Sequence, residues 1–227
     1  DQKGFLYARF RQGSVGIPAY LHDYAFAIWA ARNLYMTTCG TVYLQKALLR
    51  QQPLLDLFYD TERAGFYLTS TAHDDLIFRP KEYYDGAMPA GNSVAFVGLQ
   101  YLATLSRNQT WQKMTENCFS AYLPLVEANP TAYCFLLLGF LNMAYPETEL
   151  IAVLGQQEEK KNLMDWLGNQ NTERLVLVAI EEKNMEQIKS MFPHLRDYVL
   201  KPGESKYYFC TEQRCLAPVK SLEKQKK

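Results

Sequence analysis

The chain has 227 residues, of which 48% are hydrophobic and 14% aromatic, enough for one large domain or a domain with a small appendage. Its 24 basic residues balance its 24 acidic residues, so the sequence carries no net charge that would attract nucleic acid or an anionic membrane surface. The longest apolar run, residues 132–145, is interrupted by Asn142 and is too short to span a bilayer. We therefore expect neither a nucleic-acid partner nor a membrane partner.

The chain begins with a segment, residues 4–16, that predicts a short strand and a turn. Apolar residues at helical spacing follow over residues 24–35, with His22 and Asp23 at the start of this helix. Asp23 either caps the helix or presents its carboxylate to a pocket. A second helix is predicted over residues 42–58, with a kink at Pro53.

Residues 60–65 then predict a turn, and residues 65–78 a small β-hairpin formed by 65–70 and 76–78. The polar loop that follows, residues 79–93, reads RPKEYYDGAMPAGNS, and its prolines and glycines exclude a continuous helix. Asn92 or Ser93 can cap the next helix. A polar loop at a helix start is suited to binding a polar ligand, and the alternative is a surface loop held by its own salt bridges.

Three further helices are predicted over residues 93–105, 111–123 and 132–144, with Thr110 capping the second and Thr131 opening the third. Helices paired through short turns, with a hairpin between two pairs, are typical of an α/α toroid or a helical solenoid. We therefore predict a mainly α fold, with residues 1–146 forming part of a helical toroid.

The periodicity changes from helical to strand-like after Pro146. Residues 150–155 predict a strand, 156–167 a helix and 174–180 a second buried strand, which together are typical of a parallel βαβ unit. A short helix over 186–192 and a last strand over 207–210 complete a small α/β element, residues 147–227, with a frayed tail. The first turn of this unit is Gly-Gln-Gln, which does not resemble a phosphate-binding loop, and no cofactor is expected.

Five cysteines are present, an odd number that does not suggest a disulfide framework. Cys39, Cys118 and Cys134 lie in apolar, helix-like settings, where we expect buried thiols. Cys210 and Cys215 have the spacing of neither a redox pair nor a zinc site, so two reduced thiols are favoured over a disulfide or a ligand pair. No metal site is expected, and a reducing, cytoplasmic compartment is favoured.

Three stretches resemble a known family: residues 13–26 (GSVGIPAYLHDYAF), 79–94 (RPKEYYDGAMPAGNSV) and 208–219 (YFCTEQRCLAPV). The family is that of the thioredoxin-domain-containing proteins related to spermatogenesis-associated protein 20 and bacterial YyaL. The resemblance implies that the chain is the C-terminal part of such a protein. A thioredoxin-like domain would precede an (α/α)6-type barrel similar to six-hairpin glycosidases and to N-acylglucosamine 2-epimerase. The family usually has two acids where this chain has His22 and Asp23.

Loops at one end of such a barrel form a funnel, and both polar segments of this chain lie just before helices. We expect their side chains to converge in one concave region that processes carbohydrate, as a glycosidase or an epimerase does. The alternative is a non-catalytic sugar-binding or scaffold module. The expected catalytic residues are Asp23, Glu82 and Asp85, and the expected binding residues are His22, Tyr24, Arg79, Lys81, Tyr83, Tyr84 and Asn92. The missing part of the barrel would leave the helices at 24–35 and 132–144 uncovered, which favours self-association through the open face.

Overall fold

The computed structural model describes residues 4–71, 73, 76–145, 147–211 and 214–222. The chain divides into two compact units, the first formed by Asp1–Arg32 with Val42–Met143 and the second by Asn33–Thr41 with Ala144–Lys227. Helices and a two-stranded hairpin make up most of the first unit, and a four-stranded mixed sheet organises the second. The predicted mainly helical class is therefore confirmed.

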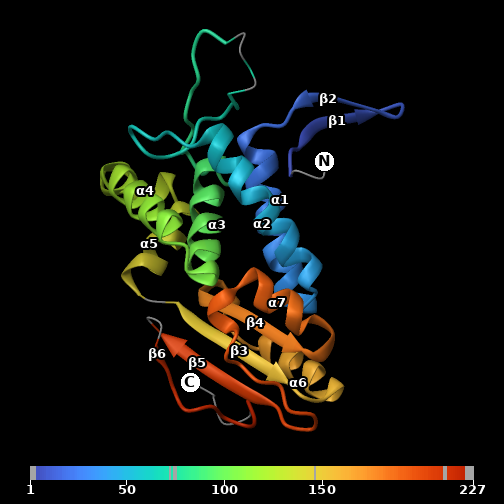
Figure 1. Ribbon diagram of the computed structural model, residues 1–227. Coiled ribbons are helices and arrows are strands. Elements are labelled where there is room, and N and C mark those ends of the chain that lie inside the picture. The colour runs from blue at the N-terminus through green and yellow to red at the C-terminus, as the bar shows by residue number, and fades with distance from the viewer. Residues whose placement is uncertain (1–3, 72, 74–75, 146, 212–213, 223–227) are drawn as a thin grey trace. The chain divides into compact units, whose positions relative to one another are not determined.

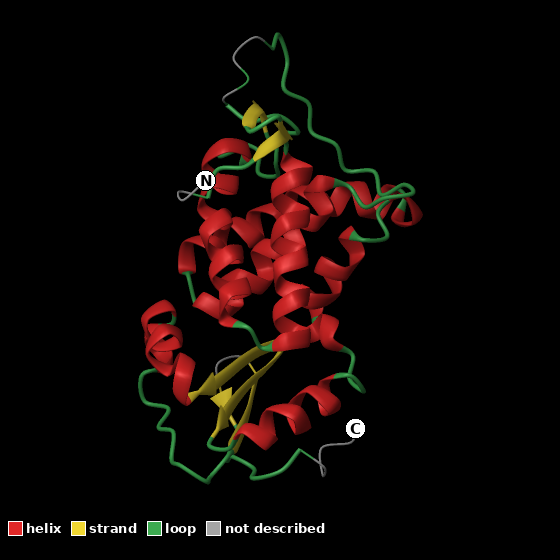
Figure 2. Ribbon diagram, turned by 90° about the vertical axis from the view of Figure 1, so that its right-hand side faces the viewer, coloured by secondary structure: helices red, strands yellow, loops and turns green. Residues whose placement is uncertain are grey.

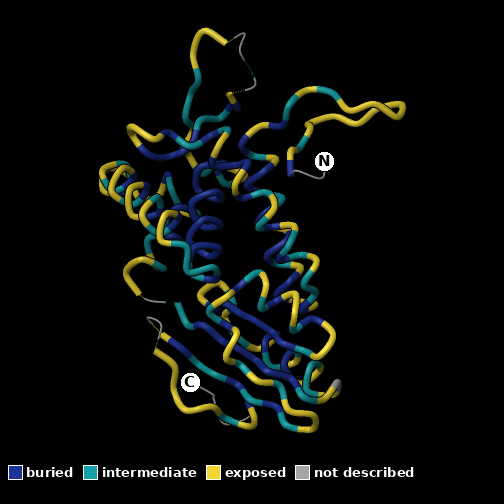
Figure 3. The backbone as a smooth tube through the Cα atoms, viewed as in Figure 1, coloured by how far each residue is buried: buried dark blue, intermediate teal, exposed yellow. Residues whose placement is uncertain are grey.

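Five helices lie wholly or mainly in the first unit (Figure 1). They are α1 (Leu21–Thr38), α2 (Thr41–Phe58, with Pro53 inside), α3 (Gly91–Ser106), α4 (Gln109–Ala128) and α5 (Leu136–Ala144). All residues of α3 except Thr104 and Ser106 are buried, so this helix forms the centre of the unit (Figure 3). A helix that is apolar on all sides is stable only where other elements cover it all round. In the described part of the first unit, these helices do not close into a ring.

Several helix starts differ from the prediction. The cap of α4 is Asn108 rather than Thr110, because the Asn108 side chain accepts the N–H of Trp111 at 3.1 Å. Helix α5 begins at Leu136 because Pro130–Ala132 first form a 3-10 turn, η1. Neither Asn92 nor Ser93 caps α3, since both already lie inside the helix and Ala90 holds the cap position without a side-chain bond.

The expected strand and turn near the N-terminus are confirmed as a hairpin of β1 (Tyr7–Arg11) and β2 (Ser14–Pro18). Its two turn residues, Gln12 and Gly13, both have positive φ, as the tight turns that suit the twist of a hairpin require. Every residue of β1 is exposed, so this hairpin stands clear of the core of its unit (Figure 3).

The second predicted hairpin, at 65–78, is wrong for the residues that the structure describes. Phe66 forms only an isolated bridge with Tyr59, and the described residues 76–78 form no strand. Positions 72, 74 and 75 lie outside the described residues. The chain does return beside residue 68, where Leu68 donates its N–H to Pro80 at 2.8 Å. Pro80 has no N–H to give back, so this contact cannot grow into a ladder.

The predicted βαβ unit is confirmed in the second unit. Strand β3 (Thr148–Leu154) is followed by α6 (Gln157–Leu167) and by β4 (Leu175–Glu181), which pairs in parallel with β3. Both strands are almost entirely buried, as expected for a parallel pair.

The predicted last strand and short helix are also present. Strand β5 (Lys206–Thr211) joins β3 antiparallel and β6 (Arg214–Cys215) follows it, which gives the sheet order β4-β3-β5-β6 (Figure 1). Figure 2 shows the strands in yellow. The remaining elements are α7 (Met185–Met191) and three 3-10 turns, η2 (Thr172–Arg174), η3 (Glu182–Asn184) and η4 (Pro193–Leu195).

The cysteines correct two expectations. Cys39 and Cys118 are buried thiols as predicted, but Cys134 is exposed. Cys210 and Cys215 form a disulfide instead of two thiols, because they are direct partners on the adjacent strands β5 and β6. Sequence spacing alone did not reveal that a hairpin brings the two together.

Candidate functional site

The polar loop before α3 has two rows of side chains. From residue 81 to residue 86 partly buried and exposed positions alternate, as side chains do along an extended backbone. We name the partly buried Arg79, Lys81, Tyr83 and Asp85 the inner row, and the exposed Glu82 and Tyr84 the outer row. The two rows have different partners.

Arg79, in the inner row, holds the loop to main-chain oxygens. Its Nε and Nη2 donate to the carbonyl of Thr69 at 3.1 and 2.7 Å, and Nη2 also donates to the carbonyl of Leu57 at 2.9 Å. The guanidinium lies 4.3 Å from the centre of the Tyr67 ring, a cation–π contact. The charge of Arg79 is therefore engaged within the fold.

Lys81 forms a nearly buried ion pair with Asp60. Its Nζ lies 2.6 Å from Asp60 Oδ2, and it also donates to the carbonyl of Ala64. Asp60 accepts three further bonds, from the N–H groups of Glu62 and Arg63 and from the Tyr67 hydroxyl. Burial raises the pKa of the Asp60 carboxyl, but the bond from Lys81 and these three donors outweigh it and hold the pKa well below its usual range.

Asp85 connects the starts of two helices. Its Oδ1 accepts the N–H of Ala90, just before α3, at 2.8 Å. Its Oδ2 accepts the N–H groups of Phe135 and Leu136, at the start of α5, at 2.8 and 2.9 Å. Helix starts leave such N–H groups without partners inside the helix, and a carboxylate is a favourable acceptor for them.

Asn92 uses all of its hydrogen-bonding capacity inside the core. Its Oδ1 accepts from the N–H of Phe66 at 2.7 Å and from the Tyr122 hydroxyl at 3.0 Å. Its Nδ2 donates to the carbonyls of Phe66 at 2.8 Å and Glu82 at 2.9 Å. Asn92 is 1% exposed, so it joins the polar loop to α3 and α4 without facing solvent.

Tyr83, the remaining member of the inner row, packs into an aromatic group. Its ring meets that of Tyr122 edge-on at 5.2 Å, and Tyr122 in turn meets Phe96 of α3 at 5.5 Å. Burial raises the pKa of Tyr83 to about 12 and that of the neighbouring Cys118 thiol to about 11. Neither group is set up to exchange a proton near neutral pH.

Two of the three candidates at the start of α1, Asp23 and Tyr24, are also bonded to nearby main-chain groups. Asp23 accepts the N–H of Tyr20 at 2.8 Å, which is one half of a capping box at the helix start. Tyr24 is buried and its hydroxyl accepts the N–H of Leu6 at 2.9 Å. Tyr24 lines a separate, mostly apolar cavity of about 180 Å³ at the base of the β1–β2 hairpin.

The outer row faces an open hollow of about 330 Å³. Glu82 and Tyr84 line it together with His22 of α1 and with the chain from Gly86 to Ala90. His22 Nε2 accepts the N–H of Gly91 at 3.2 Å, so Nδ1 carries the hydrogen in the neutral ring. Within the described residues the Glu82 carboxylate has no bonded partner, and Tyr84 is 62% exposed.

The predicted site residues thus divide into two groups. His22, Glu82 and Tyr84 line the hollow. The other seven hydrogen-bond to groups within the fold, pair with Asp60 or pack in the aromatic core. Sequence reasoning missed Asp60, Tyr67 and Tyr122. The only available signal was Asp60 at the head of a DTER turn, where Asp commonly accepts N–H bonds two or three residues on.

Metal binding and membrane crossing find no support in the described part of the chain. No group of three or more His, Cys, Asp or Glu side chains lies close enough there to hold a metal ion. None of the helices that the structure describes combines the length and the apolar composition needed to cross a membrane.

Comparison with known proteins gives distant relatives. No protein-family model matches the sequence. Human spermatogenesis-associated protein 20 is 23% identical over 203 residues, which cover 88% of this chain and 26% of the human protein. The mouse protein of the same name is 24% identical over 204 residues, with 88% and 26% covered. An uncharacterized protein of Caenorhabditis elegans is 23% identical over 214 residues, with 93% and 28% covered. The chain therefore spans about a quarter of the length of these curated relatives, to which it is distantly homologous.

Proposed function

We propose that this chain is a non-catalytic ligand-binding module of a longer protein, and that the hollow beside His22, Glu82 and Tyr84 takes a carbohydrate or a similar polar small molecule. One observation carries the proposal: three of the ten predicted site residues, a carboxylate, an imidazole and a phenol, line one open hollow. Its volume of about 330 Å³ lies within the range of small-molecule sites, roughly 300–1,000 Å³.

The chemistry of the three side chains suits a sugar. The exposed Tyr84 ring offers an apolar face on which a sugar ring can stack. The Glu82 carboxylate accepts hydrogen bonds from hydroxyl groups, and such charge-assisted bonds are the stronger ones. The Nδ1 hydrogen of His22 supplies a donor.

Binding is favoured over glycoside hydrolysis because hydrolysis needs two carboxyl groups on either side of the bond that breaks. Of the three acids expected to be catalytic, only Glu82 lines the hollow. Asp23 and Asp85 accept main-chain N–H groups at helix starts. An epimerase-like reaction is the second candidate, since His22 and Glu82 line the same hollow and an imidazole is the usual base in such chemistry.

The wider protein is part of the proposal. The quarter-length match supports a chain that is one part of a longer protein. The family resemblance further favours the C-terminal part of a thioredoxin-domain-containing protein. On this view the helices of the first unit belong to an (α/α)6-type toroid that the rest of the protein completes. Self-association through the open face of this partial toroid is the corresponding expectation for the chain alone.

A panel of neutral, amino and acidic monosaccharides, followed by calorimetry on the best ligand, tests the binding site. Tyr84→Ala and Glu82→Gln should each weaken binding about tenfold, the effect of losing a contact of about 1.4 kcal/mol. Tyr84→Phe keeps the ring and should bind nearly as the wild type does. Glu127→Gln, an exposed acid on α4, is the matched control. The absence of binding to any sugar, or equal binding by all variants, would refute the proposal. Turnover that His22→Ala abolishes would favour the epimerase.

A further inference from the structure

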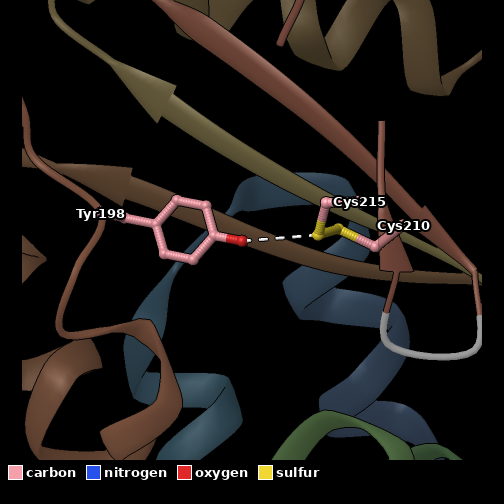
Figure 4. The surroundings of a disulfide bond; sticks show 3 residues. All are labelled: Tyr198, Cys210 and Cys215. Carbon is pink, nitrogen blue, oxygen red and sulfur yellow. Dashed lines mark hydrogen bonds between the residues drawn. A yellow bond between two sulfur atoms is a disulfide. The ribbon is translucent and has the colours of Figure 1, made fainter. Parts of the chain in front are cut away.

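The Cys210–Cys215 disulfide lies at the edge of the second unit's sheet (Figure 4). It joins direct partners on β5 and the two-residue strand β6 and closes a loop with a sequence separation of only 5. Cross-links that close short loops restrict the unfolded chain least. Main-chain bonds already hold the same segment, since Leu216 donates to Phe209 and Val219 pairs with Tyr207. The position of the bond therefore suggests a role other than global stabilisation.

The two sulfur-bearing residues have different access to solvent. Cys210 is 1% exposed, whereas Cys215 is exposed. Thiol–disulfide exchange needs direct approach of a thiolate to one of the two sulfurs. Only the Cys215 side of this bond is open to that approach.

Tyr198 contacts the sulfur of Cys215. Its hydroxyl lies 3.6 Å from Cys215 Sγ, and its ring packs edge-on against Tyr208 of β5 with centroids 4.8 Å apart (Figure 4). A disulfide sulfur carries no hydrogen, so the hydroxyl is the donor in this contact. The same hydrogen bond stabilises a thiolate on Cys215 once the disulfide is open.

The other cysteines have different settings. Cys39 and Cys118 are buried, and burial raises the pKa of each thiol to about 11, which keeps both protonated and unreactive. Cys134 is exposed, but its thiol donates to the carbonyl of Thr131 at 3.3 Å and no second cysteine is bonded to it.

We propose that Cys210–Cys215 is a thiol–disulfide exchange site that reacts with dithiols through Cys215. The incoming thiolate bonds to Cys215 Sγ, the S–S bond breaks, and its electron pair goes to Cys210 Sγ, which takes a proton from water. The second thiolate of the dithiol then attacks the mixed disulfide, and Cys215 leaves with the electron pair beside the Tyr198 hydroxyl. Cys215 then takes a second proton from water, and the two protons that the dithiol lost on ionising have passed to water. The chain gains two electrons and two protons, and the dithiol becomes a disulfide.

Trapping the mixed disulfide tests which sulfur is attacked. A Cys134→Ser chain is exposed briefly to glutathione without denaturant, quenched in acid, alkylated and digested with trypsin. Cleavage after Arg214 places Cys210 in the peptide 207–214 and Cys215 in the peptide 215–220. The glutathione adduct should be at least about tenfold more abundant on the second peptide. Equal adducts on both peptides, or adducts only after urea, would overturn the proposal.

A second measurement tests the hydrogen bond. In a Cys134→Ser, Cys210→Ser chain, Cys215 is the one exposed thiol within the described residues, and its alkylation rate is followed against pH. Tyr198→Phe should move the midpoint of this profile to higher pH, because the thiolate loses its donor. Tyr208→Phe removes a neighbouring hydroxyl that makes no contact with the sulfur and should leave the midpoint in place. An unchanged midpoint in Tyr198→Phe would show that the hydroxyl does not act on Cys215.

Discussion

In the inner row of the polar loop, the charged side chains bond to main-chain groups and to the buried acid Asp60. On the outer row, one residue further along the same backbone, Glu82 and Tyr84 face an open hollow. Both rows combine charged side chains with a tyrosine. The difference shows that charge density in a loop is not by itself evidence of a binding site, because the fold decides which charges remain available for a ligand.

Removing Asn92, the buried residue that joins the polar loop to α3 and α4, should have the largest effect. Asn92→Ala removes four hydrogen bonds and leaves the Tyr122 hydroxyl and both main-chain groups of Phe66 without that partner. We expect the free energy of unfolding to fall by about 3–5 kcal/mol, measured by urea denaturation.

Ser93→Ala is the matched control for Asn92. Ser93 is the next residue of α3 and fully buried, but its hydroxyl has no hydrogen-bond partner in the described structure. Its loss should change the free energy of unfolding by less than about 1 kcal/mol. Similar losses in the two variants would mean that the hydrogen bonds of Asn92 contribute little.

The ion pair of the inner row predicts a pH dependence. Asp60→Asn should lower the free energy of unfolding at pH 7 by about 2–3 kcal/mol, because Lys81 loses a nearly buried partner. The folded-state pKa of Asp60 lies below its unfolded value of about 3.9, so its contribution is present above that pH and is lost as pH falls toward the folded value. The difference in free energy of unfolding between the wild type and Asp60→Asn should therefore decrease in acid. Urea denaturation at a series of pH values between about 5 and 2 measures this difference. Parallel curves down to the lowest pH would contradict this account.

The smallest expected changes in stability come from a direct comparison of one acid in each row, Asp85 and Glu82. Asp85→Asn keeps one acceptor oxygen but replaces the other with a donor, so one of the two helix starts loses its partner. A loss of about 1–2 kcal/mol in the free energy of unfolding follows. Glu82→Gln, on the outer row, should stay within about 0.5 kcal/mol of the wild type. An Asp85→Asn chain that is as stable as the wild type but fails to bind ligand would place Asp85 in the binding site and contradict its role at the two helix starts.

The secondary structure could be predicted largely from periodicity. Apolar spacing indicated the helices and the buried pair β3 and β4, because burial in these elements follows the sequence period directly. The hairpin at 65–78 failed because Pro80 has no N–H to donate, and the start of α5 was misplaced by a 3-10 turn at Pro130. These are local effects of single residues on hydrogen bonding.

The candidate site was predictable only in outline. The loop was recognised as polar and placed at a helix start. The alternative, a surface loop held by its own salt bridges, anticipated that the charges are engaged within the fold, but Lys81 and Asp85 bond to groups outside the loop. The sequence did not show which groups these side chains bond to. Asp85 bonds to residues 50 and 51 positions away, and Lys81 bonds to an acid in an earlier turn. The disulfide was missed because β6 has only two residues, too few for a strand periodicity that would have predicted its pairing with β5.

The shared carboxylate of Asp85 has a consequence for the order of folding. Helix α5 has nine residues, fewer than the roughly 12–15 at which an isolated helix becomes even marginally stable in water. Its first N–H groups depend on an acid 50 residues earlier in the chain, which reaches them only when that loop has closed. Helix α5 is therefore expected to form late, after the polar loop has settled against α3, and to lose its structure together with that loop when the protein opens.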